Sequence, residues 1–203
     1  MKRIVLLMTV CLLSSCSGVV RNTPPVAVYD FGLPAARLVT DGSWSRLALE
    51  VRSPAWFESL NVDYRLAYDE PLKQREYVGS RWAGAPGVLL VQRLRQQIGA
   101  VNATGNTLTD CLLRVELQEF SQIFDTLQQS RALLQGNVSL IDAKRQVLVE
   151  RTVVIEKPAA TADANGGVNA LVAASSELGQ QLTDWLGRLD KAILGNCRST
   201  QIK

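Results

Sequence analysis

The chain has 203 residues, with 22 Lys and Arg against 19 Asp and Glu, four cysteines and no histidine. Without histidine it cannot form a Ser-His-Asp or Cys-His catalytic set, and it lacks the commonest metal-binding side chain. Its length is sufficient for one domain with a sizeable core.

The first sixteen residues have the pattern of a bacterial lipoprotein signal. Lys2 and Arg3 precede an apolar run, residues 4–13, that is too short to span a bilayer, and two serines then lead to Cys16. We expect residues 1–15 to be removed as a signal peptide and Cys16 to be acylated, palmitate included. Several acyl chains would hold the protein on a membrane almost permanently, because each buried methylene contributes about 0.8 kcal/mol. The alternative is an ordinary signal peptide with a chance thiol at its cut site.

Removal of residues 1–15 leaves 188 residues, with 20 Lys and Arg against 19 Asp and Glu. A net charge of +1 does not favour nucleic-acid binding. Residues 16–25 are polar and contain proline, which is typical of a tether. We therefore expect a lipidated N-terminus and tether over residues 16–25, followed by a single domain over residues 26–203.

Alternating apolar residues predict four short strands in the first half of this domain, at residues 26–31, 47–51, 62–68 and 76–78. Pro86 predicts the start of a helix, because its fixed φ suits the first helical turn, and Gly99 is placed to end that helix. The predicted helix has a polar side that includes Arg93, which we expect to face solvent. Its apolar stripe consists of Leu90, Val91, Leu94 and Ile98.

The second half predicts three more strands, at residues 111–120, 134–141 and 147–155. The connection at 142–146 is short enough for a hairpin, which favours an antiparallel meander. Residues 168–194 predict a long amphipathic helix with Leu182, Trp185 and Leu189 against the sheet. The predicted fold is α+β: a largely antiparallel sheet with two helices packed on it, in a single domain behind the tether.

Two of the four cysteines remain in the mature domain. Cys11 leaves with the signal peptide and Cys16 carries the lipid, so that Cys111 and Cys197 are left. Outside the cytoplasm, two remaining thiols favour one disulfide between them. The alternative is two separate buried thiols.

No glycine-rich loop has the context of a phosphate-binding site, and the acidic residues are scattered. Asp63, Asp69 and Glu70 come closest to a cluster, beside Arg65, and a solvated face with ion pairs explains them better than acid–base catalysis. A Ser-Lys pair stays open as an alternative. We expect that the protein is not an enzyme and that it has no catalytic residues, cofactor or metal.

Residues 80–86 read Ser-Arg-Trp-Ala-Gly-Ala-Pro and lead directly into the first predicted helix. An exposed Trp82 beside Arg81 would be able to anchor a partner protein, because exposed aromatic and arginine side chains are frequent binding hot spots. The alternative is that Trp82 forms a buried cap over the start of the helix.

The order of several short motifs resembles a known family. The motifs are the early strand Val28-Tyr29-Asp30-Phe31, the apolar-x-Tyr-Arg strand Val62-Asp63-Tyr64-Arg65, the step Ser80-Arg81-Trp82-Ala83 before Pro86, and an apolar strand ending at Phe120. Together with the lipobox-like residues 13–16 and the long C-terminal helix, they resemble the ABC-type transport auxiliary lipoprotein components, the PqiC-like proteins, over roughly residues 27–194. Gly84-Ala85 departs from the acidic or proline residues common in that family.

The resemblance implies a non-catalytic lipoprotein subunit of an MCE-type ABC phospholipid transport system. It implies an MCE-domain protein and an inner-membrane permease and ATPase as partners. A homo-oligomer and direct phospholipid binding stay open. Ser17 follows Cys16, with no Asp there to retain the lipoprotein in the inner membrane, so we expect the periplasmic face of the outer membrane. The alternative is a structural or chaperone-like lipoprotein for assembly of an outer-membrane complex.

Overall fold

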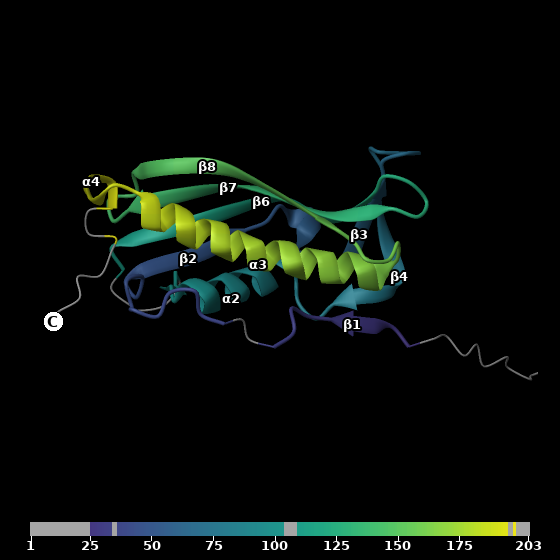
Figure 1. Cartoon of the computed structure of the whole chain (residues 1–203), viewed down its shortest axis with the longest axis horizontal. Helices are drawn as coiled ribbons and strands as arrows, with labels where there is room; N and C mark the ends of the chain where they lie inside the picture. Colours follow the sequence, from purple (N-terminus) through teal and green to yellow (C-terminus); the bar gives the residue numbers. More distant parts are fainter. Residues whose placement is uncertain (1–24, 34–35, 104–108, 195–196, 198–203) are drawn as a thin grey trace, which may run out of the picture.

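A mixed sheet carries two helices, α2 and α3, on one face in the computed structural model, which describes residues 25–33, 36–103, 109–194 and 197 (Figure 1). The predicted signal peptide, Cys16 and the tether up to residue 24 lie outside the described residues. The elements in chain order are β1 (Ala27–Tyr29), β2 (Leu47–Arg52), the 3-10 turn η1 (Ala55–Phe57), β3 (Asn61–Leu66), β4 (Gln74–Trp82), α2 (Pro86–Ile98), β5 (Val101–Asn102), β6 (Cys111–Phe124), β7 (Ser130–Asp142), β8 (Val147–Pro158), α3 (Ala164–Arg188) and α4 (Lys191–Leu194).

The central strand of the sheet is β6. On one side it pairs with β7 along its whole length, and β8 continues this antiparallel meander. On its other side it pairs first with β2 and then, near its end, with β3, both in parallel orientation. The strands β4 and β1 extend the sheet beyond β3, and β5 lies beside β2.

The predicted α+β class, with two helices packed on a sheet in one domain, is confirmed. The two long ladders of the meander are antiparallel, as predicted. Four shorter pairings, β1–β4, β2–β5, β2–β6 and β3–β6, are parallel. Parallel strands need a long crossover connection, and here the segment between β2 and β6 contains α2. The alternation of apolar and polar residues along a strand does not indicate that its neighbour in the sheet is parallel.

Helix α2 has the predicted start at Pro86 and the predicted stop at Gly99. Gly99 takes φ +79°, and its N–H donates to the carbonyl of Arg95 at 2.9 Å. This left-handed position suits glycine, because a side chain would be strained there.

The C-terminal helix differs from the prediction at both ends. Helix α3 begins at Ala164, because the Asp163 carboxylate accepts a hydrogen bond from Gly166 N at 2.8 Å and caps the first turn. That hydrogen bond also holds the pKa of Asp163 below its usual value. The helix ends at Arg188, Leu189 is extended, and Asp190 starts the separate short helix α4 by accepting from Ala192 N at 3.0 Å. The prediction of a single helix over residues 168–194 is therefore wrong.

The two helices bury their apolar faces against the sheet and against each other. Leu182 is fully buried, as predicted, whereas Trp185 and Leu189 are only partly buried at the margin of the core. Where α2 and α3 meet, Gly179 leaves room for the buried side chain of Gln97, whose Oε1 would lie 2.1 Å from a Cβ at that position. The fully buried leucines of α3 are Leu171, Leu178, Leu182 and Leu186.

Cys111 and Cys197 form the predicted disulfide, with 5.1 Å between their Cα atoms. It joins the first residue of β6 to the chain just after α4. The bridged residues are 86 positions apart, and closing a loop of that length is worth about 4–5 kcal/mol in the chain-entropy model. The disulfide thus holds the C-terminal end of the helical layer to the central strand.

Leu182→Ala should lower the free energy of unfolding by about 2–5 kcal/mol, because it leaves a cavity between α3 and the sheet. Urea unfolding of the lipid-free protein measures the loss. Gln180→Ala is the matched control, since Gln180 lies on the exposed side of the same helix, and it should shift the midpoint little. Equal midpoints for the two variants would show that α3 does not form part of the core.

Candidate docking surface on the open face of the sheet

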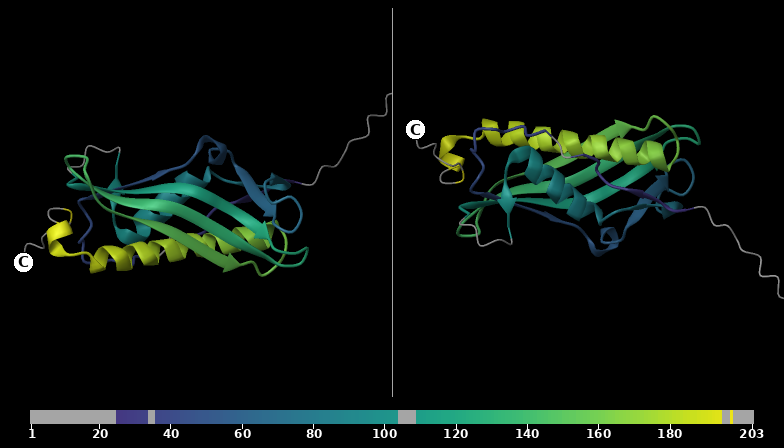
Figure 2. Two further views of the ribbon diagram at one scale, coloured as in Figure 1. Left: turned by 90° about the horizontal axis from the view of Figure 1, so that it is seen from above. Right: turned by 90° about the horizontal axis from the view of Figure 1, so that it is seen from below.

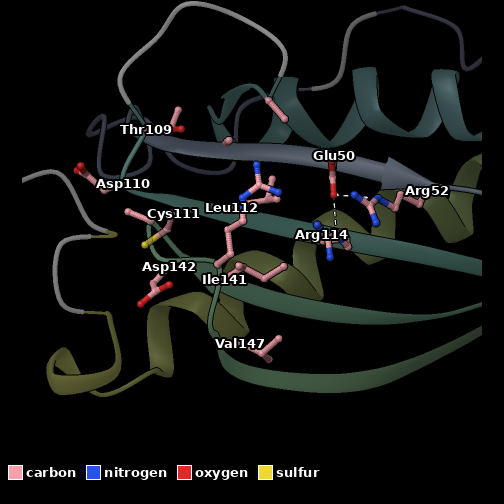
Figure 3. Close-up of a pocket in the computed structure, with 14 residues that line it drawn as sticks. Glu50, Arg52, Thr109, Asp110, Cys111, Leu112, Arg114, Ile141, Asp142 and Val147 are labelled. Carbon is pink, nitrogen blue, oxygen red and sulfur yellow. Dashed lines mark hydrogen bonds and ion pairs between the residues drawn. The ribbon is translucent and has the colours of Figure 1, made fainter.

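Within the described part of the chain, the two helices cover one face of the sheet and leave the other face open (Figure 2). On this open face, β2, β6 and the β7–β8 hairpin surround a depression of about 550 Å³ (Figure 3). The residues that line it are Ala48, Glu50, Arg52, Ala103, Thr109, Asp110, Cys111, Leu112, Arg114, Ile141, Asp142, Ala143, Arg145 and Val147.

A carboxylate and two arginines form the central charged group of this depression. Glu50 on β2 lies directly opposite Arg114 on β6 in the parallel register. Its Oε1 atom lies 2.5 Å from Arg114 Nε and 3.1 Å from Arg52 Nε (Figure 3). The side chains of Glu50 and Arg114 are about a quarter exposed, so water screens the pair only in part.

The rim carries further charges that are held in place locally. Asp110 pairs with Arg46 at 2.8 Å, and Asp142 accepts from Gln146 N at 2.8 Å within the β7–β8 hairpin. Arg145 takes φ +65° in this hairpin and is exposed.

Three arginines and three carboxylates line the depression, so their formal charges cancel. Its apolar lining includes Ala48, Leu112, Ile141 and Val147. A surface of this composition suits a protein partner with mixed charges better than a free anion.

A second polar group lies along the same sheet at β3. Asp63 is only 6% exposed, and Arg65 pairs with Glu119 of β6 at 3.4 Å. Burial raises the pKa of the Asp63 carboxyl to about 6; a hydrogen bond from Gln74 and the charge of Arg65 oppose this, while Glu76 and Glu119 reinforce it. The expectation of a solvated face therefore holds for Asp69 and Glu70, which are exposed, but not for Asp63.

Asp63→Asn should stabilise the protein by about 1–3 kcal/mol at about pH 8, since it removes a buried charge. Between the ordinary pKa and about 6, the folded state binds more protons at Asp63 than the unfolded state. The loss of folding stability caused by the buried Asp63 carboxylate therefore grows as the pH rises through this range, and it is complete above about pH 6. The gain should therefore be small at about pH 4, because this pH is close to the ordinary pKa of 3.8 and little of the cost has developed there. Urea unfolding at the two pH values measures it, with the exposed Asp69→Asn as control. An equal gain at both values would contradict the raised pKa.

The structure buries Trp82, which is 1% exposed, so it is not available as a docking anchor. Its ring packs against Phe31 and Phe120, with centroids 5.7 and 5.8 Å away, and the backbone N–H of Trp82 donates to Leu60 O at 2.7 Å. The alternative of a buried aromatic before the helix is the correct one. Arg81 beside it is exposed, and its docking role stays a prediction.

The expectation that Arg93 faces solvent is wrong. The segment after β1 crosses over α2, where Leu38 N donates to Gln97 O at 2.8 Å. Under this segment, the Arg93 guanidinium donates to the carbonyl of Phe31 and lies 5.9 Å from the centre of the Phe31 ring. No local sequence pattern indicates this contact, because it depends on where a distant segment lies.

Among the described residues, no group of three or more acidic or cysteine side chains is placed to hold a metal ion. Within the same residues, no helix is both long enough and apolar enough to cross a membrane.

The family model described as ABC-type transport auxiliary lipoprotein component matches residues 29–184. The chain belongs to this family. The match extends from the end of β1 into α3 and includes all the residues that line the open-face depression as well as Asp63, while Cys16 and Cys197 lie outside it.

Solved structures share the fold of this auxiliary lipoprotein. A Xanthomonas campestris protein of family DUF330 has 18% identity and a TM-score of 0.63, over 78% of this chain and 94% of that one. An uncharacterized protein has 16% identity and a TM-score of 0.63, over 80% of this chain and 99% of that one. No curated protein sequence matches the chain.

Proposed function

We propose that the protein is the lipoprotein subunit of an MCE-type ABC phospholipid transport system, anchored through Cys16 in the outer membrane and facing the periplasm. Its task is to dock the other components, and it catalyses no reaction. The observation that carries the proposal is the family match over residues 29–184, in a chain whose residues 13–16 read as a lipobox.

The domain organisation follows from this assignment. Residues 1–15 are the signal peptide, residues 16–25 the lipidated N-terminus and tether, and residues 26–203 the auxiliary lipoprotein domain. The lipid anchor supplies the attachment to the membrane, so the folded domain is free to bind a protein.

The position of the depression favours it as the docking surface for the MCE-domain protein. Strand β6 has 14 residues, so Cys111 and Phe124 lie about 40 Å apart at its two ends. The depression surrounds the Cys111 end, and the N-terminal end of β1, from which the tether continues, points toward the Phe124 end. A partner that approaches from the periplasm therefore meets the depression first. The permease and ATPase then associate through the MCE protein.

The charged groups of the depression support binding over catalysis. Glu50 pairs with both Arg52 and Arg114, and Asp110 pairs with Arg46. A general acid or base has to be free to exchange a proton with a substrate, and these groups are held in ion pairs instead.

Cys16→Ala should leave a folded protein that no longer sediments with the outer membrane, because the lipid provides the attachment and not the packing of the domain. Fractionation of envelopes in high salt, with circular dichroism of the released protein, measures both properties. A variant that still sediments with the outer membrane would contradict the lipid anchor.

Crosslinking in intact envelopes tests the transport assignment. The tagged protein is captured after crosslinking, and its partners are identified by mass spectrometry. We expect an MCE-domain protein, followed by the permease and ATPase of the same system. Capture of a secretin or an outer-membrane barrel in their place would favour the assembly role and contradict the transport role.

A further inference from the structure

Two exposed leucines lie on neighbouring loops at one end of the molecule. Leu72, in the loop between β3 and β4, is 95% exposed, and Leu127, in the β6–β7 hairpin, is 75% exposed. The loops adjoin, because Leu66 pairs with Phe124 and Ala67 N donates to Phe124 O at 2.9 Å. Figure 1 places both loops at the right-hand end of the long axis. The two leucines therefore belong to one end surface.

The first strand of the domain, β1, starts on the side of the same end. Strand β1 is parallel to β4, β4 is antiparallel to β3, and β3 is parallel to β6. The N-terminal end of β1 therefore points toward the Phe124 end of β6. Ten residues, 17–26, separate Cys16 from Ala27, and a chain of that length spans at most about 35 Å. A lipid on Cys16 thus keeps the bilayer within about 35 Å of the start of β1, a distance that allows this end of the molecule to reach it.

The charges beside the leucines are compatible with a membrane surface. Glu70 pairs with Lys73 at 3.1 Å and also with Arg75, and Asp125 pairs with Arg131. The hydrogen bond and charge of Lys73 hold the pKa of Glu70 below its usual value, with Arg75 adding to this. Each of these carboxylates is thus accompanied by a cation, which lowers the cost of bringing the loops to the lipid interface.

We propose that Leu72 and Leu127 insert into the headgroup–acyl boundary of the membrane that holds the lipid anchor. The inference rests on the proposed acylation of Cys16. Single exposed leucines are ordinary, but two at adjacent loop tips beside the anchor have a lipid surface within reach. Insertion directs the long axis of the domain away from the membrane, so that the open-face depression faces the periplasm.

The test places a fluorescent label at single cysteines in the full-length lipidated protein. Leu72→Cys and Leu127→Cys are compared with Val147→Cys, which is also apolar and 55% exposed but lies in the β7–β8 hairpin at the opposite end. Cys111 and Cys197 are joined in the disulfide, so the introduced thiol takes the environment-sensitive label. Each protein is reconstituted into phosphatidylethanolamine–phosphatidylglycerol vesicles, with flotation to check the anchor and circular dichroism to check the fold.

We expect blue-shifted emission and quenching by acyl-brominated lipid at positions 72 and 127, and neither at position 147. Labels at 72 and 127 that behave like the label at 147, in protein that floats with the vesicles, would overturn the inference and leave the anchor intact. Protein that does not float would overturn the anchor and the inference together.

Discussion

The hydrogen bonding of β6 on both of its sides determines where the other elements lie. One side takes β7 over its full length, while the other is divided between β2 and β3. Strands β2 and β3 pair one after the other along this second side of β6. The chain therefore reaches the Phe124 end of β6 before β4 turns back. The disulfide then fastens the C-terminal end of the helical layer to the first residue of β6. The molecule is consequently elongated, and its two ends differ in chemistry.

Local sequence signals predict the helices and the meander well. Pro86 and Gly99 mark α2 because each is suited to its backbone position, and the wide apolar face of α3 requires the sheet beneath it. The parallel pairings, the break at Leu189 and the burial of Arg93 follow from contacts between distant segments. For the same reason, the sequence left two alternatives for Trp82, and the packing of Phe31 and Phe120 decides between them.

The candidate docking surface is harder to predict than the fold. Glu50 and Arg114 meet only because β2 pairs in parallel with β6, a register that neither strand indicates by itself. Asp63 occupies an ordinary polar position in an alternating strand, and its burial depends on the neighbouring β4 and β6. The lipid anchor is the opposite case, since the order of charge, apolar run, small residues and Cys16 indicates it from the sequence alone.

Site-specific photo-crosslinking at the depression tests the docking role most directly. The crosslinker replaces Arg145, which is exposed at the rim, and the control position is Gln180 on the outer side of α3. In intact envelopes, the Arg145 position should crosslink to an MCE-domain protein, and the Gln180 position should not. Crosslinks to that protein from Gln180 but not from Arg145 would contradict docking through the open face of the sheet.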